Sequence, residues 1–366
     1  MAPRGTGIAC PASGRGLPQL PDSNTIPMSA ASATSASPAT RKQTRLIRLL
    51  TLVALLAMVA AYFAPIWWVS LTAPNYPKDA FPDGIRIHFH LDGVHNGCKA
   101  AVKGSQLANE TIQADVDKDT ERYNPVLDAK KDLNAEAKGL DCVHEMNTIN
   151  HYVGMFPIST GAPVEKPLAK FFIAFFVVMM AAFALIERRL RLVVLGLGFA
   201  AVATWAVVDQ FVLGHLASHV KAYVEEAGTF FKEPDKIQAW GDNVVLYTKV
   251  GIGVLVAAMA VVWLGVWKLR SFELLMALVP ALMPLFFVLE YAGWLWFFGH
   301  NLHPWGAFTV KPFMPTVFGE GKVAQFSTFS YPHYGYALLL LASGCLLVAL
   351  LLRRKQLRSE AAGSPA

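Results

Sequence analysis

Residues 49–71 read LLTLVALLAMVAAYFAPIWWVSL, an apolar run without a charged side chain. A helix needs roughly 20 apolar residues to cross a bilayer, so this run is long enough to span one. Five further runs of comparable character follow, at 170–187, 191–214, 248–267, 272–298 and 333–352. The sequence therefore predicts an all-α membrane protein with about six transmembrane helices.

The composition agrees with a bilayer as the main partner. Hydrophobic residues make up 54% of the 366 residues and charged residues only 16%, against roughly 25% charged in soluble domains. The formal net charge is +6, but the basic residues lie in short clusters beside apolar runs, which indicates no nucleic-acid partner. The run at 319–322 lacks the rest of a phosphate-binding loop, so no ATP site is expected.

Four basic clusters predict the orientation. They precede the first run, fill the turns between the second and third and between the fourth and fifth, and follow the sixth. Basic residues stay on the cytoplasmic side, and all four clusters lie there only if six spans leave both termini inside. We expect a multi-pass protein of a bacterial inner (cytoplasmic) membrane. A cleavable signal ending near Ala64 is the alternative reading of the first run, and its length favours an anchor.

The segments between the spans define the expected domains. A tail rich in Ala, Ser, Pro, Thr and Gly cannot bury enough apolar surface to fold, and the first outer segment combines one strand with helix formers at 105–141, which indicates a small mixed α/β domain. The expected parts are a disordered cytoplasmic tail (1–42), the first transmembrane helix (43–71), an extracytoplasmic domain (72–169), a five-helix region (170–352) with outer loops (215–247 and 299–332), and a cytoplasmic tail (353–366).

The strand in the first outer segment carries paired histidines. Residues 85–92 read IRIHFHLD, with apolar and polar side chains in strict alternation, which predicts a half-buried strand. His88 and His90 then project side by side, an arrangement that suits copper or zinc. A solvated polar face is the alternative interpretation.

Two cysteines lie in the same outer segment. Cys98 and Cys142 would face an oxidising compartment, where a disulfide is expected, although copper-bound thiolates are the alternative. Residues 142–155 read CVHEMNTINHYVGM, in which imidazole and thioether groups are donors that copper accepts. We expect His151 and Met155 to share one helix face. The further candidate donors are His144, Met146, His88, His90, His300 and His303.

Asp209 and Glu290 lie within predicted spans, where ionisable groups indicate function. Asp209 is near the outer end of the third span, with His215 and His219 following on the same helix, and Glu290 is near the outer end of the fifth. Every histidine maps to the outer half of the membrane or beyond it. Haem between two helical histidines is a possible cofactor, but copper fits the rim position of these residues better.

The outer segments resemble a family of uncharacterised bacterial membrane proteins. The resemblance is carried by Ala73-Pro74 with Tyr76-Pro77, by Asn147, and by Asn150-His151-Tyr152-Val153-Gly154-Met155. It extends to Gly299-His300, Pro304, Lys311-Pro312-Phe313, Pro315 and residues 319–326. The long N-terminal tail and the cysteine-containing insertion at 98–142 depart from the family pattern.

Members of that family are associated with accessory genes of copper enzymes, notably periplasmic nitrous oxide reductase. The resemblance implies a membrane accessory protein, not an enzyme by itself, that handles copper at the extracytoplasmic face for a periplasmic or membrane copper oxidoreductase. Two other classes remain open. One is a quinol-linked or haem-containing electron-transfer subunit, with Asp209 and Glu290 as proton acceptors, and the other is a transporter.

Overall fold

The computed structural model describes residues 38–74, 76, 81–98, 141–156, 163–230, 233–304, 306, 309–323 and 325–362. Residues from Ala39 onward form one compact unit, which is mostly helical. Five of its helices are long and apolar enough to cross a membrane, and the count is six if the bent pair of residues 270–281 and α10 forms one span. These helices are α1 (Pro38–Tyr62), α5 (Glu165–Phe183), α6 (Arg188–Val207), α8 (Pro234–Lys268), the short α9 (Leu275–Ala281), α10 (Met283–His300) and α11 (Tyr334–Ala362).

The bend between α9 and α10 has a local cause. Pro280 lies inside α9 and Pro284 lies in the first turn of α10, and each proline removes a backbone donor from the helix. The helix before the break and α10 meet at 50°. The hydroxyl of Ser343 donates to the carbonyl of Ala281 at 2.6 Å, which satisfies an acceptor at the break.

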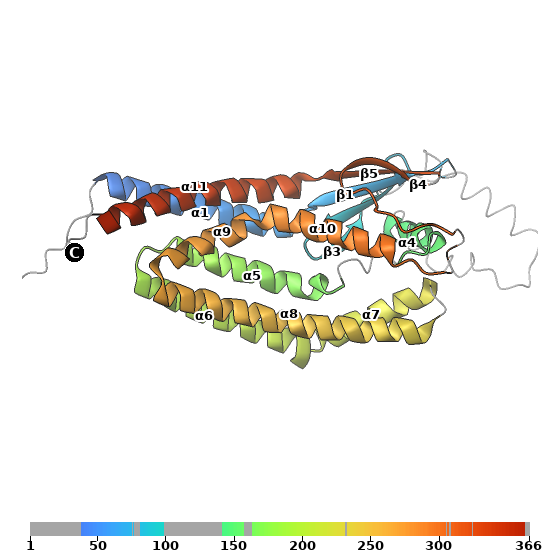
Figure 1. Cartoon of the computed structure of the whole chain (residues 1–366), viewed down its shortest axis with the longest axis horizontal. Coiled ribbons are helices and arrows are strands. Elements are labelled where there is room, and N and C mark those ends of the chain that lie inside the picture. Colours follow the sequence, from blue (N-terminus) through green and yellow to red (C-terminus); the bar gives the residue numbers. More distant parts are fainter. Residues whose placement is uncertain are drawn as a thin grey trace, which may run out of the picture. The chain divides into compact units, whose positions relative to one another are not determined.

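A five-stranded antiparallel sheet lies at one end of the helices (Figure 1). Its strand order is β3-β2-β1-β5-β4. The outer segments before the second span and before the last span therefore build one sheet, and not a domain confined between the first two helices. The strands are β1 (Trp67–Thr72), β2 (Ile85–His90), β3 (Gly93–Asn96), β4 (Gly319–Val323) and β5 (Phe326–Pro332).

The prediction of one helix through 49–71 is wrong at its outer end. Helix α1 ends at Tyr62, and residues 67–72 form the central strand β1. Pro65 disfavours helical backbone in the residue before it, and the aromatic and β-branched side chains after it suit a strand. The start also differs, because α1 begins at Pro38 within the predicted tail, whereas residues 1–37 lie outside the described residues.

The alternation at 85–92 is confirmed as strand β2. Ile85 and Ile87 are completely buried on the face that packs toward the helices, while Arg86, His88 and His90 occupy the opposite face. Strand β1 alternates in step, since Trp68 pairs with His88 and Val69 pairs with Ile87.

Trp67 joins the sheet to the helices. Its indole N–H donates to the Ser330 hydroxyl on β5 at 2.9 Å, and the Tyr291 hydroxyl of α10 lies 3.2 Å from the same oxygen. The Ser330 hydroxyl in turn donates to the carbonyl of Val317 at 2.8 Å. All three polar side chains are buried, so each hydrogen bond satisfies a group that water does not reach.

Helices occupy the predicted outer loop 215–247 and most of the predicted C-terminal tail 353–366. The predicted outer loop 215–247 is helical, because it contains α7 (His215–Phe230) and the first turns of α8. Gly214, with a φ of 72°, ends the helical backbone. His215 and His219 therefore lie on a separate helix, α7, and do not continue the third span. The C-terminal tail is helical as far as Ala362. The remaining short helices are α4 (Cys142–Tyr152), η3 (Val208–Val212) and η4 (Arg270–Leu274).

Cys98 and Cys142 form a disulfide with their Cα atoms 5.9 Å apart. The bond joins the chain after β3 to the start of α4 across a sequence separation of 44 residues. Closing a loop of that length in the unfolded chain contributes about 4 kcal/mol in the entropic description. The helices expected at 105–141 lie outside the described residues apart from Asp141, which caps α4 through bonds to two backbone N–H groups.

Candidate functional site

Four histidines and one aspartate gather around β2, β3 and the end of β5. We call His88, His90, His95, His333 and Asp92 the histidine cluster. Strand β2 supplies the first two, and β3 supplies His95, which pairs directly with His88 in the register. Asp92 lies in the turn between these strands, and His333 follows β5.

The rings and the carboxylate are close enough to act together. The His90 and His95 ring centres are 4.3 Å apart, and Asp92 Oδ1 lies 3.1 Å from His95 Nε2. One donor atom from each of these three residues lies within 4.8 Å of the other two. Metal–ligand bonds of about 2.0–2.2 Å need a closer approach, which rotation of the half-exposed His95 side chain allows. The His88 and His333 ring centres lie 5.1 Å apart beside this group.

The electrostatics of the cluster favour metal-binding protonation states. Burial, reinforced by neighbouring His333 and Arg86, lowers the pKa of His88 to about 4. Burial also lowers the pKa of His90, and the hydrogen bond from His95 lowers the pKa of Asp92. Neutral imidazoles and an ionised carboxylate are the forms that bind a metal. Among the described residues, the buried His88 Nε2 has no hydrogen-bond partner.

The thioether donors of the 142–155 segment lie elsewhere. Met146 is buried in the main core against the inner face of the sheet, and Met155 packs with Val153 and Phe298. Helix α4 ends at Tyr152, so the expectation that His151 and Met155 share one helix face is wrong. The turn that follows the helix directs the chain into the apolar core instead.

That turn has a structural role. Gly154 has a φ of 81°, and its carbonyl accepts a hydrogen bond from the backbone N–H of His303 at 2.7 Å. The Met155 N–H donates to the Asn150 carbonyl at 2.8 Å. The NHYVGM motif therefore docks α4 onto the segment after α10.

The other predicted donors do not join the cluster. His144 is exposed on α4. His300 stacks on Trp296 with ring centres 4.5 Å apart, and its Nδ1 lies 2.8 Å from that residue's carbonyl oxygen. The ring of His303 packs edge-on against Phe156 at 4.7 Å. None of the three belongs to a group of metal donors found among the described residues.

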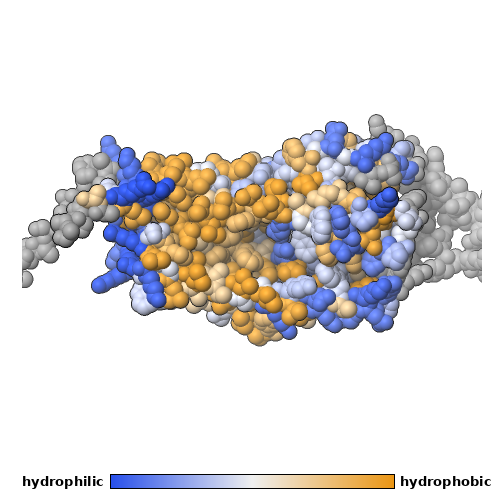
Figure 2. Space-filling view, viewed as in Figure 1, coloured by the Kyte–Doolittle hydropathy of each residue, from blue (hydrophilic) through white to orange (hydrophobic). Residues whose placement is uncertain are grey.

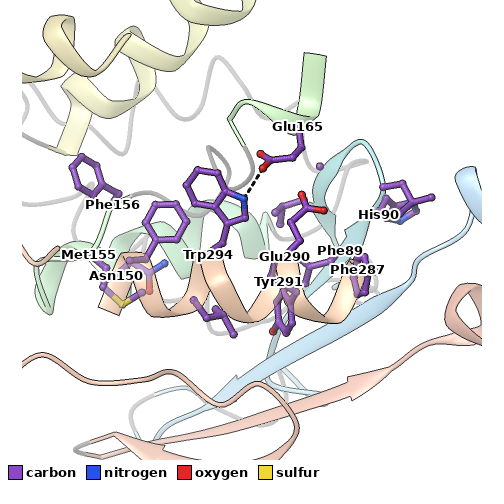
Figure 3. Close-up of a pocket in the computed structure, with 15 residues that line it drawn as sticks. Phe89, His90, Asn150, Met155, Phe156, Glu165, Phe287, Glu290, Tyr291 and Trp294 are labelled. Atoms are coloured by element: carbon purple, nitrogen blue, oxygen red, sulfur yellow. Dashed lines mark hydrogen bonds between the residues drawn. The ribbon is translucent and has the colours of Figure 1, made fainter. Parts of the chain in front are cut away.

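Glu290 lines a second candidate site, an aromatic cavity of about 80 Å³ behind the sheet. Figure 3 shows its carboxyl group pointing toward that of Glu165, the first residue of α5. The indole N–H of Trp294 donates to Glu165 at 3.0 Å. Asn150 and His90 also line the cavity, so it extends to a member of the histidine cluster. Sequence reasoning missed Glu165, because it is the residue before Lys166 and reads as an exposed helix start.

Asp209 lies beside a cationic side chain. It lies on η3, a single π-helical turn that follows α6. Its carboxylate is 2.6 Å from Lys170 Nζ and 3.0 Å from His215 Nδ1, and it accepts a hydrogen bond from Gln210. The ammonium group of Lys170 on α5 and the hydrogen bonds from α7 and Gln210 offset the cost of burying this acid.

Comparisons with known proteins give no further assignment. No protein-family model, no curated protein and no solved structure matches this chain. The site must therefore be interpreted from its own geometry.

We predict that Gly154→Ala destabilises the outer region by about 2 kcal/mol or more, because an alanine there adopts a left-handed backbone at a cost. Its Cβ would also lie 2.5 Å from the His303 carbonyl oxygen. Thermal unfolding measures the effect. Gly228→Ala on α7, where no atom lies within 4 Å of the added Cβ, is the control and should not destabilise. Equal stability of the two variants would contradict a docking role for the motif.

Proposed function

We propose that the chain crosses a bacterial inner membrane six times, with the bent pair α9–α10 as one span and both termini in the cytoplasm. Figure 2 shows hydrophilic residues at both ends of the molecule and a hydrophobic surface between them, which supports a membrane-spanning arrangement. The basic end carries Arg188, Arg189, Arg270 and Arg354, and an excess of arginine marks the cytoplasmic side. The sheet and its disulfide then face an oxidising compartment.

Single cysteines test the orientation. In a Cys10→Ser, Cys345→Ser background, Lys322→Cys on the exposed β4 should react with a membrane-impermeant maleimide added outside the inner membrane. Arg189→Cys, which is exposed at the opposite end, should react only after that membrane is breached. The reverse pattern would contradict the proposed orientation.

We propose that the histidine cluster binds copper at the extracytoplasmic face. The observation that carries this proposal is the convergence of donor atoms from His90, Asp92 and His95 within 4.8 Å. Nitrogen and oxygen donors bind Cu²⁺ more tightly than Zn²⁺ and the other divalent first-row ions. His88, whose buried Nε2 has no hydrogen-bond partner among the described residues, pairs with His95 across the strands and is a further candidate donor.

An accessory role suits the exposure of this cluster better than a permanent redox centre. The side chains of His95 and Asp92 are 50% and 39% exposed, so a partner could approach the ion directly. The proposed function is therefore to hold copper for the maturation or support of a copper oxidoreductase, such as nitrous oxide reductase. The resemblance of the outer segments to proteins associated with such enzymes supports this choice of partner.

We predict that His90→Ala and His95→Ala each weaken copper binding by about 10-fold or more, because each removes a ligand. Equilibrium dialysis of the purified protein followed by metal analysis measures the affinity. His144→Ala and Met155→Leu are the controls and should bind copper normally. Retention of copper by both cluster variants, or an equal loss in His144→Ala, would contradict the proposed site.

A specific observation favours electron transfer from a quinol as a second candidate. Glu290 lines both the inner cavity and an open groove of about 360 Å³ between α8 and α10, flanked by Trp240 and Trp294. Gly293 leaves the groove floor open, which gives a ring-shaped head group room to lie between aromatic walls. A hydroquinone there could donate a hydroxyl hydrogen bond to Glu290, and the inner cavity leads to His90.

Under this second candidate, Glu290→Gln should weaken binding of a soluble quinol analogue by about 5-fold, because the carboxyl group that accepts the hydroquinone hydrogen bond is lost. Quenching of tryptophan fluorescence reports occupancy of the groove. Asp242→Asn, the same chemical change at an exposed position on α8, is the matched control. No binding to the wild-type protein would eliminate this candidate and leave copper handling untouched.

A further inference from the structure

A polar cavity of about 230 Å³ lies at the basic end of the helices, and no residue of the histidine cluster lines it. It lies where the α5–α6 connection, η4 and the last turns of α11 meet. Its charged lining consists of Arg188, Arg191, Arg270, Arg353 and Glu273. The end of the molecule that contains it is the hydrophilic end opposite the sheet in Figure 2.

Buried contacts hold two of the guanidinium groups in place. The side chains of Arg191 and Arg353 are 4% and 10% exposed. Arg191 donates to Glu273 and, through Nε and Nη2, to the carbonyl of Leu185 at 3.1 and 2.6 Å. Arg353 Nε donates to the other oxygen of Glu273 at 2.8 Å. Both groups are therefore fixed before any ligand arrives, which reduces the entropy lost on binding.

Two further arginines form the rim of the cavity. Arg188 donates to the carbonyl of Trp267, and Arg270 pairs with Glu360 at 2.7 Å. Both rim residues are exposed. A ligand can therefore reach the buried pair between them.

The charges of this cavity do not balance. Among the described residues, the buried Arg191 and Arg353 share one buried carboxylate, Glu273, which leaves one buried positive charge. At the exposed rim, Glu360 lies near Arg270 and Arg353. Each oxygen of Glu273 already accepts from an arginine. Unmatched buried charge is costly, so an anion in the cavity would stabilise this end of the protein.

We propose that this cavity binds a phosphate group, and that its natural source is an anionic phospholipid of the adjacent leaflet. Guanidinium groups match phosphate oxygens with paired hydrogen bonds. The cavity lies at the end of the apolar spans, and basic pockets between helices on the cytoplasmic side suit lipid head groups. Ile186 at its edge and the neighbouring Trp267 are 46% and 52% exposed, which offers apolar surface to the acyl chains. Free phosphate shares the same chemistry.

Delipidated, detergent-purified protein in phosphate-free buffer tests the proposal. Binding of phosphatidylglycerol, phosphatidylcholine and inorganic phosphate is measured by native mass spectrometry and by the shift in thermal unfolding temperature. The wild-type protein should bind phosphatidylglycerol and be stabilised by it. It should neither bind phosphatidylcholine nor be stabilised by it. The Arg188→Gln, Arg270→Gln double variant should bind phosphatidylglycerol about 10-fold more weakly or worse, because two charge-assisted contacts are lost.

Arg189→Gln is the matched control, since Arg189 is exposed on the same turn and does not line the cavity. It should bind phosphatidylglycerol like the wild-type protein. Should the double variant fold poorly in phosphatidylcholine, Arg188→Lys, Arg270→Lys keeps the charge but loses the paired geometry and should give an intermediate affinity.

Stabilisation by inorganic phosphate alone, with the same dependence on Arg188 and Arg270, would support the site and assign free phosphate as its source. Equal binding of both lipids would overturn the proposal. An equal loss in Arg189→Gln would do the same, because it would show a general effect of basic charge at this surface.

Discussion

The hydrogen bonds of Trp67 tie the sheet to the membrane-type helices. One buried hydroxyl, that of Ser330, meets the Trp67 indole and the Tyr291 phenol, so β1, β5 and α10 share a single polar junction. Because β1 follows α1 and β5 precedes α11, this junction lies where the first helix has ended and the last helix is about to begin. Buried donors are costly when unpaired, so the three elements are constrained to one relative position.

The histidine cluster follows from this arrangement. The β2–β3 turn brings His90, Asp92 and His95 together locally, whereas the β1–β5 pairing delivers His333 from the far end of the chain. The face that turns inward is apolar and filled by Ile87 and its neighbours. The same alternation therefore seals the core on one side and concentrates imidazoles on the other.

The two ends of the helices carry different chemistry. The histidine cluster and the cavity acids lie near the sheet, and the four arginines of the polar cavity lie at the opposite end. An apolar environment between them disfavours isolated charge, and the one buried acid of α6 and η3, Asp209, has Lys170 and His215 as partners. The sites proposed for copper and for phosphate are thus separate and can be tested independently.

The sequence by itself determined the apolar runs, the basic end and the alternation of β2, because hydrophobic length and periodicity are local properties. It could not determine that Trp67 belongs to a strand, since an apolar strand and an apolar helix end look alike over six residues. Nor could it assign the donors. Met155 and His90 both carry soft or borderline donor atoms. Tertiary packing buries Met155 in the core and places His90 beside His95. Strand pairing between distant segments decided the site, because register depends on partners that no local pattern reveals.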